Sequence, residues 1–141
     1  MTIYNLYIFD KEGKCLFYDE WFRTKKSGLP PDQEFKLVFG MMISLKSFAE
    51  RLSTNEATQA INYYKTSTYK MTFLESATGI KILVNSDPNA IGMSDLLNKI
   101  YQIWVEVSHC PLQFLSLDES PDGSYLKSKV KDVVMRNSSY V

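Results

Sequence analysis

The sequence has few of the residues that build covalent or metal-based frameworks. Its 141 residues include two cysteines, Cys15 and Cys110, and one histidine, His109. Two cysteines are too few for a disulfide framework, and one histidine excludes a site that needs several imidazole ligands. Glycine (6) and proline (5) are sparse, and no repeat or low-complexity segment is present. These absences predict a fold that is stabilised by an ordinary packed core.

The chain also lacks an excess of charge of either sign. Lys plus Arg is 16 and Asp plus Glu is 16, so the formal net charge is zero. A balanced chain has no bulk electrostatic reason to bind nucleic acid or anionic lipid. It also lacks the repulsion that keeps copies and neighbours apart, which mildly favours a protein that functions with partners.

Long hydrophobic runs are missing as well. The densest run, Leu37 to Ile43, is interrupted by Gly40 and is far shorter than the roughly 20 apolar residues of a membrane span. The N-terminal run 3–9 contains Asn5 and is followed by charged residues, which is not the pattern of a secretory signal. We therefore expect no membrane span and a cytosolic location.

The hydrophobic periodicity predicts one α/β (α+β) domain over residues 1–141. Expected strands cover 3–9, 15–19, 60–67, 69–75 and 80–85, and expected helices cover 32–52, about 94–110 and 124–136. The order β-β-α-β-β-β-α-α is most simply buried as a five-stranded antiparallel sheet sandwiched by helices.

Local signals refine this prediction. Residues 3–9 are apolar on both alternating faces, which indicates a central strand covered on both sides. Gly13 can supply the positive φ of a hairpin turn, and Asp32 is a good helix N-cap. The last helix is predicted from the periodicity of Leu126, Val130 and Val133.

The helix expected over 32–52 has more apolar surface than one sheet can cover. One stripe consists of Phe35, Val38, Met42, Leu45, Ala49 and Leu52, and a second stripe consists of Leu37, Met41 and Phe48. The apolar arc covers roughly 200°, about twice what a helix on a sheet needs. Either a loop covers one flank, or the second stripe packs on a partner chain. Gly40, which costs helix stability, hints at close approach of another backbone.

The search for chemistry predicts no enzyme and no cofactor or metal site. His109 and Cys110 are neighbours, and neighbours in an extended segment point to opposite faces, so they seldom form a nucleophile–base pair. Gly13-Lys14 lacks the earlier glycine and the following Ser or Thr of a phosphate-binding loop.

A local basic segment follows two aromatic residues. Arg23, Lys25 and Lys26 come directly after Trp21-Phe22. Such a segment can contact lipid headgroups or an acidic protein partner. A solvated loop with one buried ring is the favoured interpretation.

A set of short motifs, in order, resembles the small longin-type subunits of the TRAPP (transport protein particle) vesicle-tethering complex. The matching positions span about residues 1 to 112: Asn5-Leu6-Tyr7, Phe9-Asp10, Gly13, Cys15-Leu16, Tyr18, Glu20-Trp21, Arg23, Lys25, Gly28, Pro30, Lys36-Leu37, Gly40-Met41, Ser47-Phe48, Thr66-Ser67, Tyr69-Lys70, Glu75, Thr78-Gly79-Ile80-Lys81, Asn85, Asp87, Ile100-Tyr101 and Val105-Glu106. The last 29 residues depart from the family pattern.

The resemblance implies a longin-like fold and a non-catalytic scaffold. Such subunits pair with a second longin-like subunit and dock to the α/β subunits of the core, which promotes nucleotide exchange on a Rab-family GTPase in ER-to-Golgi transport. The implied location is cytoplasmic, peripheral to cis-Golgi and endoplasmic reticulum membranes. In longin pairs the first helix and the neighbouring edge strand form the dimer contact, so the partner interface is expected at Leu37, Gly40, Met41 and Phe48.

Two alternatives stay open. The small chain of a clathrin-adaptor complex has similar length and strand order, although Glu12-Gly13-Lys14 keeps only part of its Gln-Gly-Lys-type turn. A profilin-like small-ligand or enzyme domain would need a polar-lined pocket, which a sequence cannot reveal.

Overall fold

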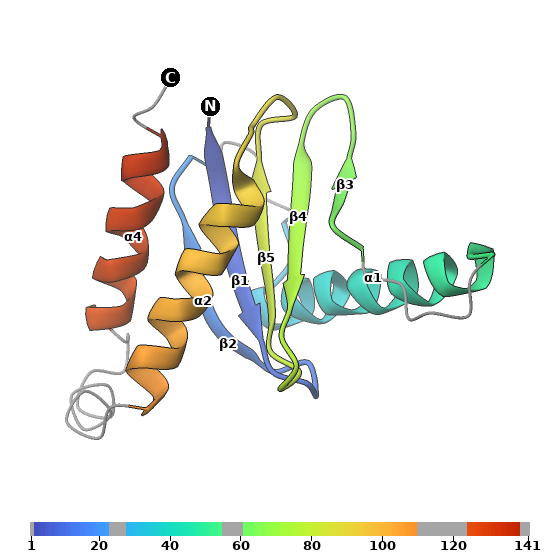
Figure 1. The fold of residues 1–141 in the computed structure, drawn as a ribbon, viewed down its shortest axis with the longest axis horizontal. Coiled ribbons are helices and arrows are strands. Elements are labelled where there is room, and N and C mark those ends of the chain that lie inside the picture. The colour runs from blue at the N-terminus through green and yellow to red at the C-terminus, as the bar shows by residue number, and fades with distance from the viewer. Residues whose placement is uncertain (1, 23–27, 55–60, 110–123, 139–141) are drawn as a thin grey trace.

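The computed structural model describes residues 2–22, 28–54, 61–109 and 124–138. The elements follow the predicted order (Figure 1). They are β1 (Ile3–Phe9), β2 (Cys15–Glu20), α1 (Pro31–Leu52), β3 (Tyr63–Lys65), β4 (Lys70–Glu75), β5 (Lys81–Ser86), α2 (Met93–His109) and α4 (Ser124–Ser138).

The five strands form one antiparallel sheet in the order β2-β1-β5-β4-β3. Helix α1 lies on one face, and α2 and α4 lie on the other (Figure 1). The predicted sheet sandwiched by helices is therefore confirmed. The central position of the first strand is also confirmed, because β1 lies between β2 and β5 and every residue in it except Tyr4 is buried.

The two faces of the sheet have cores of different size. The larger core fills the space between the sheet and the α2–α4 pair, where Leu97, Ile100 and Val130 are fully buried. The smaller core, under α1, is built around Tyr7, Phe9, Met42 and Leu83. Alternating side chains of β1 supply both cores, which is why this strand is apolar at nearly every position.

The start of α1 differs from the prediction. The N-cap is Pro30 rather than Asp32, it makes no side-chain capping bond, and Pro31 is the first helical residue. Proline suits this place because its φ is already helical and the amide hydrogen it lacks would have no partner there. Asp32 lies in the first turn, where its charge favours the positive end of the helix dipole.

Two further details of the prediction were wrong, namely the extent of the third strand and the buried stripe of the last helix. Within the described residues strand β3 covers Tyr63–Lys65, and position 60 of the expected strand lies outside them. The strand ends before Thr66, whose hydroxyl accepts hydrogen bonds from the backbone N–H groups of Thr68 (3.3 Å) and Tyr69 (3.1 Å). In α4 the buried stripe is Leu126, Val130 and Val134, whereas the predicted Val133 is only partly buried.

Two hairpin turns meet at one end of the sheet. Gly13 and Gly79 have φ of +95° and +90°, so the positive φ predicted for Gly13 is confirmed. A Cβ on Gly79 would lie 2.7 Å from Cβ of Lys11, which places the β4–β5 turn directly against the β1–β2 turn. A Cβ on Gly13 would lie 2.8 Å from the ring of Phe39 on α1.

Candidate partner-binding surface on helix α1

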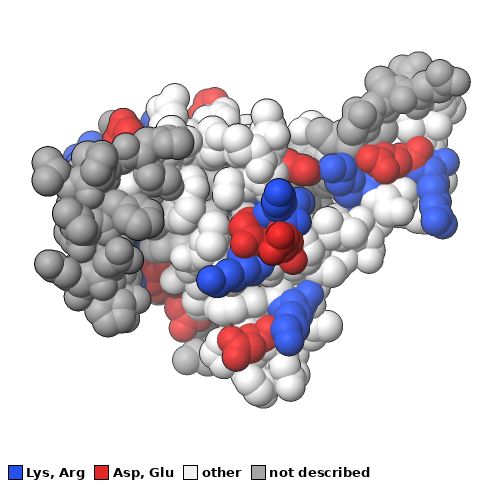
Figure 2. All heavy atoms as spheres, turned by 90° about the horizontal axis from the view of Figure 1, so that it is seen from below, with Lys and Arg blue, Asp and Glu red and all other residues white. Residues whose placement is uncertain are grey.

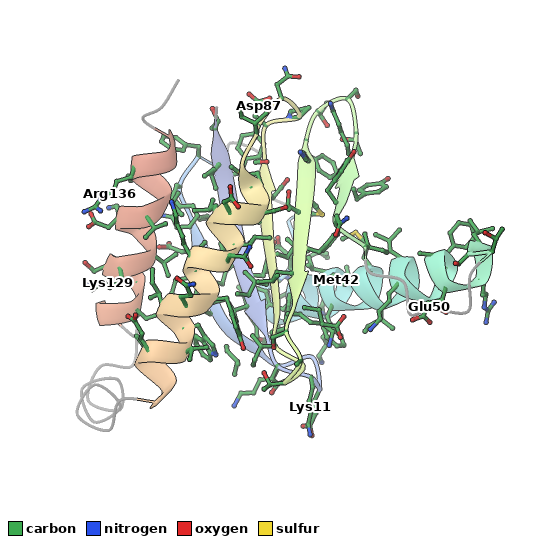
Figure 3. The ribbon with its side chains drawn as sticks, in the orientation of Figure 1. Lys11, Met42, Glu50, Asp87, Lys129 and Arg136 are labelled. Carbon is green, nitrogen blue, oxygen red and sulfur yellow. The ribbon has the colours of Figure 1, made fainter. Side chains whose placement is uncertain are left out.

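Helix α1 extends beyond the sheet that supports it. It crosses the strands on the face opposite α2, and its C-terminal part runs past β3 (Figure 1). Met42 lies between α1 and the sheet, whereas Glu50 lies on the projecting part (Figure 3). Met42 is the one buried residue of the helix. Six further apolar residues of the helix are partly buried, whereas four others are exposed: Leu37, Ile43, Phe48 and Leu52.

The inner face of α1 is held by aromatic packing. The ring of Phe35 contacts Tyr7 and Tyr18, with centroid distances of 6.0 and 5.3 Å, and the ring of Phe39 lies 5.7 Å from that of Phe9. The Tyr7 hydroxyl donates a hydrogen bond to Glu34 Oε1 at 3.0 Å. These contacts fix which side of α1 faces the sheet.

The opposite side of α1 carries three large exposed apolar residues. Leu37, Phe48 and Leu52 are 62%, 61% and 67% exposed. At 100° per residue they lie within about 60° of one another, so they form one stripe, called here the outer stripe. Leu52 had been assigned to the inner stripe, but the helix has already passed the sheet at that point.

Of the other two predicted interface residues, Met41 falls within the angular range of the outer stripe, and Gly40 lies about 60° outside it. Met41 is half-buried and packs against the core under α1, so it is shared between core and surface. Gly40 is exposed, and a Cβ placed there would meet no atom within 4 Å. None of the described residues therefore fills the space beside Gly40.

A groove adjoins α1 where it leaves the sheet. A cavity of about 160 Å³ lies between the helix and β4, lined by apolar residues that include Ile43, Leu45 and Phe73. At one end Lys46 forms an ion pair with Glu75 at 3.1 Å, which ties α1 to β4. Sequence reasoning missed this groove because it depends on how far α1 overhangs the sheet.

Strand β3 adds a free strand edge to the same region. Among the described strands it pairs only with β4. Its residues Tyr63 and Tyr64 are 57% and 40% exposed. An exposed edge presents unpaired backbone groups that can bind another chain.

The remaining predicted features carry no chemistry in the described part of the chain. Arg23, Lys25 and Lys26 lie outside the described residues, as does Cys110. Trp21 is partly buried against the larger core, and Phe22 is exposed. Lysine, arginine and acidic side chains are interspersed on the face seen in Figure 2, with no broad area of one sign.

The thiol of Cys15 is unsuited to nucleophilic chemistry at neutral pH. Burial raises the pKa of the Cys15 thiol from an ordinary value of 9.0 to about 11. Its Sγ donates a hydrogen bond to the carbonyl of Phe17 at 3.3 Å.

Among the residues with a described position, no three His, Cys, Asp or Glu side chains gather where a metal ion could be held. No described helix is long and apolar enough to cross a membrane.

The element order, the sheet order and the placement of the helices define an α+β domain in which helices cover both faces of a five-stranded antiparallel sheet. Within that class, the chain belongs to the Sybindin-like family, which matches residues 3–117. The predicted resemblance is thereby confirmed. The match ends before α4, where the family pattern had also been expected to stop.

Curated relatives are subunits of the same complex in distant organisms. Trafficking protein particle complex subunit 1 of Homo sapiens is 39% identical over 117 residues, covering 79% of this chain and 81% of that one. The Dictyostelium discoideum subunit 1 is 43% identical, covering 74% and 75%. The Saccharomyces cerevisiae subunit BET5 is 27% identical, covering 82% and 73%.

Proposed function

We propose that this chain is a non-catalytic scaffold subunit of the TRAPP tethering complex. It acts in ER-to-Golgi vesicle transport, as part of the core that promotes nucleotide exchange on a Rab-family GTPase. It is cytoplasmic and peripheral to cis-Golgi and endoplasmic reticulum membranes. The observation behind the proposal is the outer stripe of α1, an apolar surface that the described residues of the chain leave exposed.

The outer stripe is costly in a chain that stays alone. Burying one Leu or Phe side chain contributes about 1.5–3 kcal/mol, and Leu37, Phe48 and Leu52 leave most of this unrealised. Contiguous exposed apolar surface on a folded domain marks an interaction site. The opposite face of the sheet does not have this feature, because α2 and α4 cover it together.

The partner that fits is a second longin-like subunit. The overhanging part of α1 and the free edge of β3 lie on the same side of the molecule (Figure 1), so one partner can cover both. Sequence similarity extends to a second kind of subunit: subunit 4 of Bos taurus is 34% identical over 68 residues, 48% of this chain. The presence of subunits of related sequence in one complex supports the pairing of this chain with a subunit of related fold.

Co-expression tests the assignment to the complex. The full chain is expressed with longin-like and α/β TRAPP subunits, and in parallel with the large chains of a clathrin adaptor. We expect a stable complex with the TRAPP subunits alone, and we expect that complex, but not this chain by itself, to accelerate nucleotide release from a Rab-family GTPase. Assembly with the adaptor chains instead would overturn the proposal.

A further inference from the structure

A polar recess lies on the face of the sheet opposite α1. It occupies about 240 Å³ between the first turn of α2 and strands β3 and β4, and its lining includes Tyr63, Lys70, Thr72 and residues 92–95. In Figure 1 the N-terminal end of α2 lies over the sheet in this region. None of these residues belongs to the outer stripe, but Tyr63 lies on β3, whose free edge is part of the surface assigned to the partner subunit.

Thr72 leaves a buried hydroxyl without a partner in this recess. The residue is 2% exposed, and its Oγ1 makes no hydrogen bond. Buried hydroxyls nearly always have a partner, because an unpaired one loses its hydrogen bonds to water and gains none in return. Thr72 lines the recess, so a group bound there could complete its hydrogen bonding.

Lys70 brings a positive charge to the same recess. Its Nζ donates a hydrogen bond to the carbonyl of Ala90 at 3.3 Å and lies 4.6 Å from the centroid of the Tyr63 ring. These two contacts hold the ammonium in place. An ammonium has three N–H donors, so donors remain for a ligand.

The first turn of α2 supplies the third set of donors. The backbone N–H of Leu96 bonds to the carbonyl of Gly92 at 3.1 Å, which begins the intrahelical pattern. The amides of Met93, Ser94 and Asp95 precede it, and in a 17-residue helix such amides have no intrahelical acceptor. The positive end of the helix dipole adds to the field of Lys70.

Asp95 limits what the recess can accept. Asp95 is among the lining residues, and its negative charge disfavours a second negative charge nearby. An acceptor with one negative charge matches Lys70, the helix terminus and Thr72, whereas a doubly charged phosphate meets repulsion from Asp95. We propose that the recess is a binding site for a single carboxylate group.

A carboxylate can reach the recess from a small organic acid or from an acidic side chain of another protein. Titrations of the full, ¹⁵N-labelled chain with sodium acetate and with the peptide acetyl-Gly-Glu-Gly-amide separate these sources. We expect saturable shifts of the Met93 and Ser94 amide signals with both probes. Tighter binding of the peptide indicates a protein side chain, and equal or tighter binding of acetate indicates a free acid.

Variants test the assignment to these residues. Lys70→Met and Thr72→Val should each weaken acetate binding, Lys70→Met by about tenfold, because a charge-assisted hydrogen bond is lost. Asp95→Asn should tighten it. Lys99→Met, which removes an exposed lysine of α2 outside the recess, is the matched control and should change nothing.

Thr72→Val also gives a readout that does not depend on binding. Replacing an unpaired buried hydroxyl with a methyl group should raise the melting temperature, so weaker acetate binding by this variant cannot be ascribed to unfolding. Three results would overturn the proposal: no saturable shift with either probe, as for a recess that holds only water; tighter binding of inorganic phosphate than of acetate; or undiminished binding by both Lys70→Met and Thr72→Val.

Discussion

Gly13 and Gly40 are glycines for different physical reasons. Gly13 has a φ of +95° and faces the ring of Phe39, so both its backbone and its surroundings exclude a side chain. Gly40 lies in the middle of α1 with open space around it. None of the described residues requires a glycine at position 40, so we expect the requirement to come from a partner.

Replacing each of the two glycines with alanine should change the free energy of unfolding in opposite directions. Gly13→Ala should lower the free energy of unfolding by about 1–3 kcal/mol through strain at positive φ. Gly40→Ala should raise it by about 0.5–1 kcal/mol, because alanine is the better helix former. Urea denaturation of the isolated chain measures both.

If a partner backbone approaches at Gly40, the same Gly40→Ala variant should bind the partner subunit more weakly. Ser44→Ala, an exposed substitution one turn away on α1, is the matched control. Unchanged partner affinity in Gly40→Ala would mean that the glycine has no role in close approach.

The buried thiol of Cys15 should make the stability of the chain depend on pH. Its pKa is raised to about 11 in the folded chain, against an ordinary value of 9.0, so the folded state keeps this proton at pH values where the unfolded state has lost it. The contribution to stability is complete below pH 9 and is lost as the pH rises toward about 11. Urea midpoints measured from pH 8 to 11 should fall less steeply for Cys15→Ala than for the parent chain. Parallel curves would contradict the burial of the thiol.

At the scale of elements, periodicity predicted which segments are helices but not how far each is covered. The spacing of apolar residues located α1, yet only the width of the sheet determines that Met42 is buried and Leu52 is not. The N-terminus of α1 was misplaced because Asp32 is a good cap in isolation, whereas Pro30-Pro31 fixes the backbone earlier. The recess at Thr72 could not be predicted, because it depends on where α2 begins relative to β4.

Helix α4 gives a test of register. Val134 is fully buried against α2, whereas its neighbour Val133 is only partly buried. Val134→Ala should lower the free energy of unfolding by about 2 kcal/mol, and Val133→Ala by less than about 1 kcal/mol. Thermal and urea denaturation of the two variants compare the same chemical change at adjacent positions. Equal losses of stability, or a larger loss at Val133, would instead support the stripe predicted from the sequence, which consists of Leu126, Val130 and Val133.

At the scale of the whole molecule, the zero net charge and the exposed apolar outer stripe of α1 both indicate a partner contact that depends on apolar burial. Charged residues steer association and make its rate sensitive to salt, whereas apolar contacts do not. This chain has 16 positive and 16 negative side chains, and its outer stripe is apolar. The contact with the partner subunit should therefore depend on hydrophobic burial.

Salt dependence tests this expectation. The dissociation constant of this chain and its longin-like partner should change by less than about threefold between roughly 0.1 and 0.5 M NaCl, because screening has few charges to act on at the outer stripe. Isothermal titration calorimetry at both salt concentrations measures it, with the negative heat-capacity change of apolar burial as a second signature. A steep loss of affinity with salt would assign the contact to charged residues.

The most direct measurement compares three substitutions that each place an aspartate at an exposed apolar position. Leu37→Asp and Phe48→Asp alter the outer stripe, and Ile91→Asp, at a residue that is 81% exposed before α2, is the matched control. All three should fold with the melting temperature of the parent chain. Leu37→Asp and Phe48→Asp should lose the longin-like partner in size-exclusion chromatography, and Ile91→Asp should retain it. Full assembly of Leu37→Asp and Phe48→Asp would contradict the assignment of α1 as the partner-binding surface.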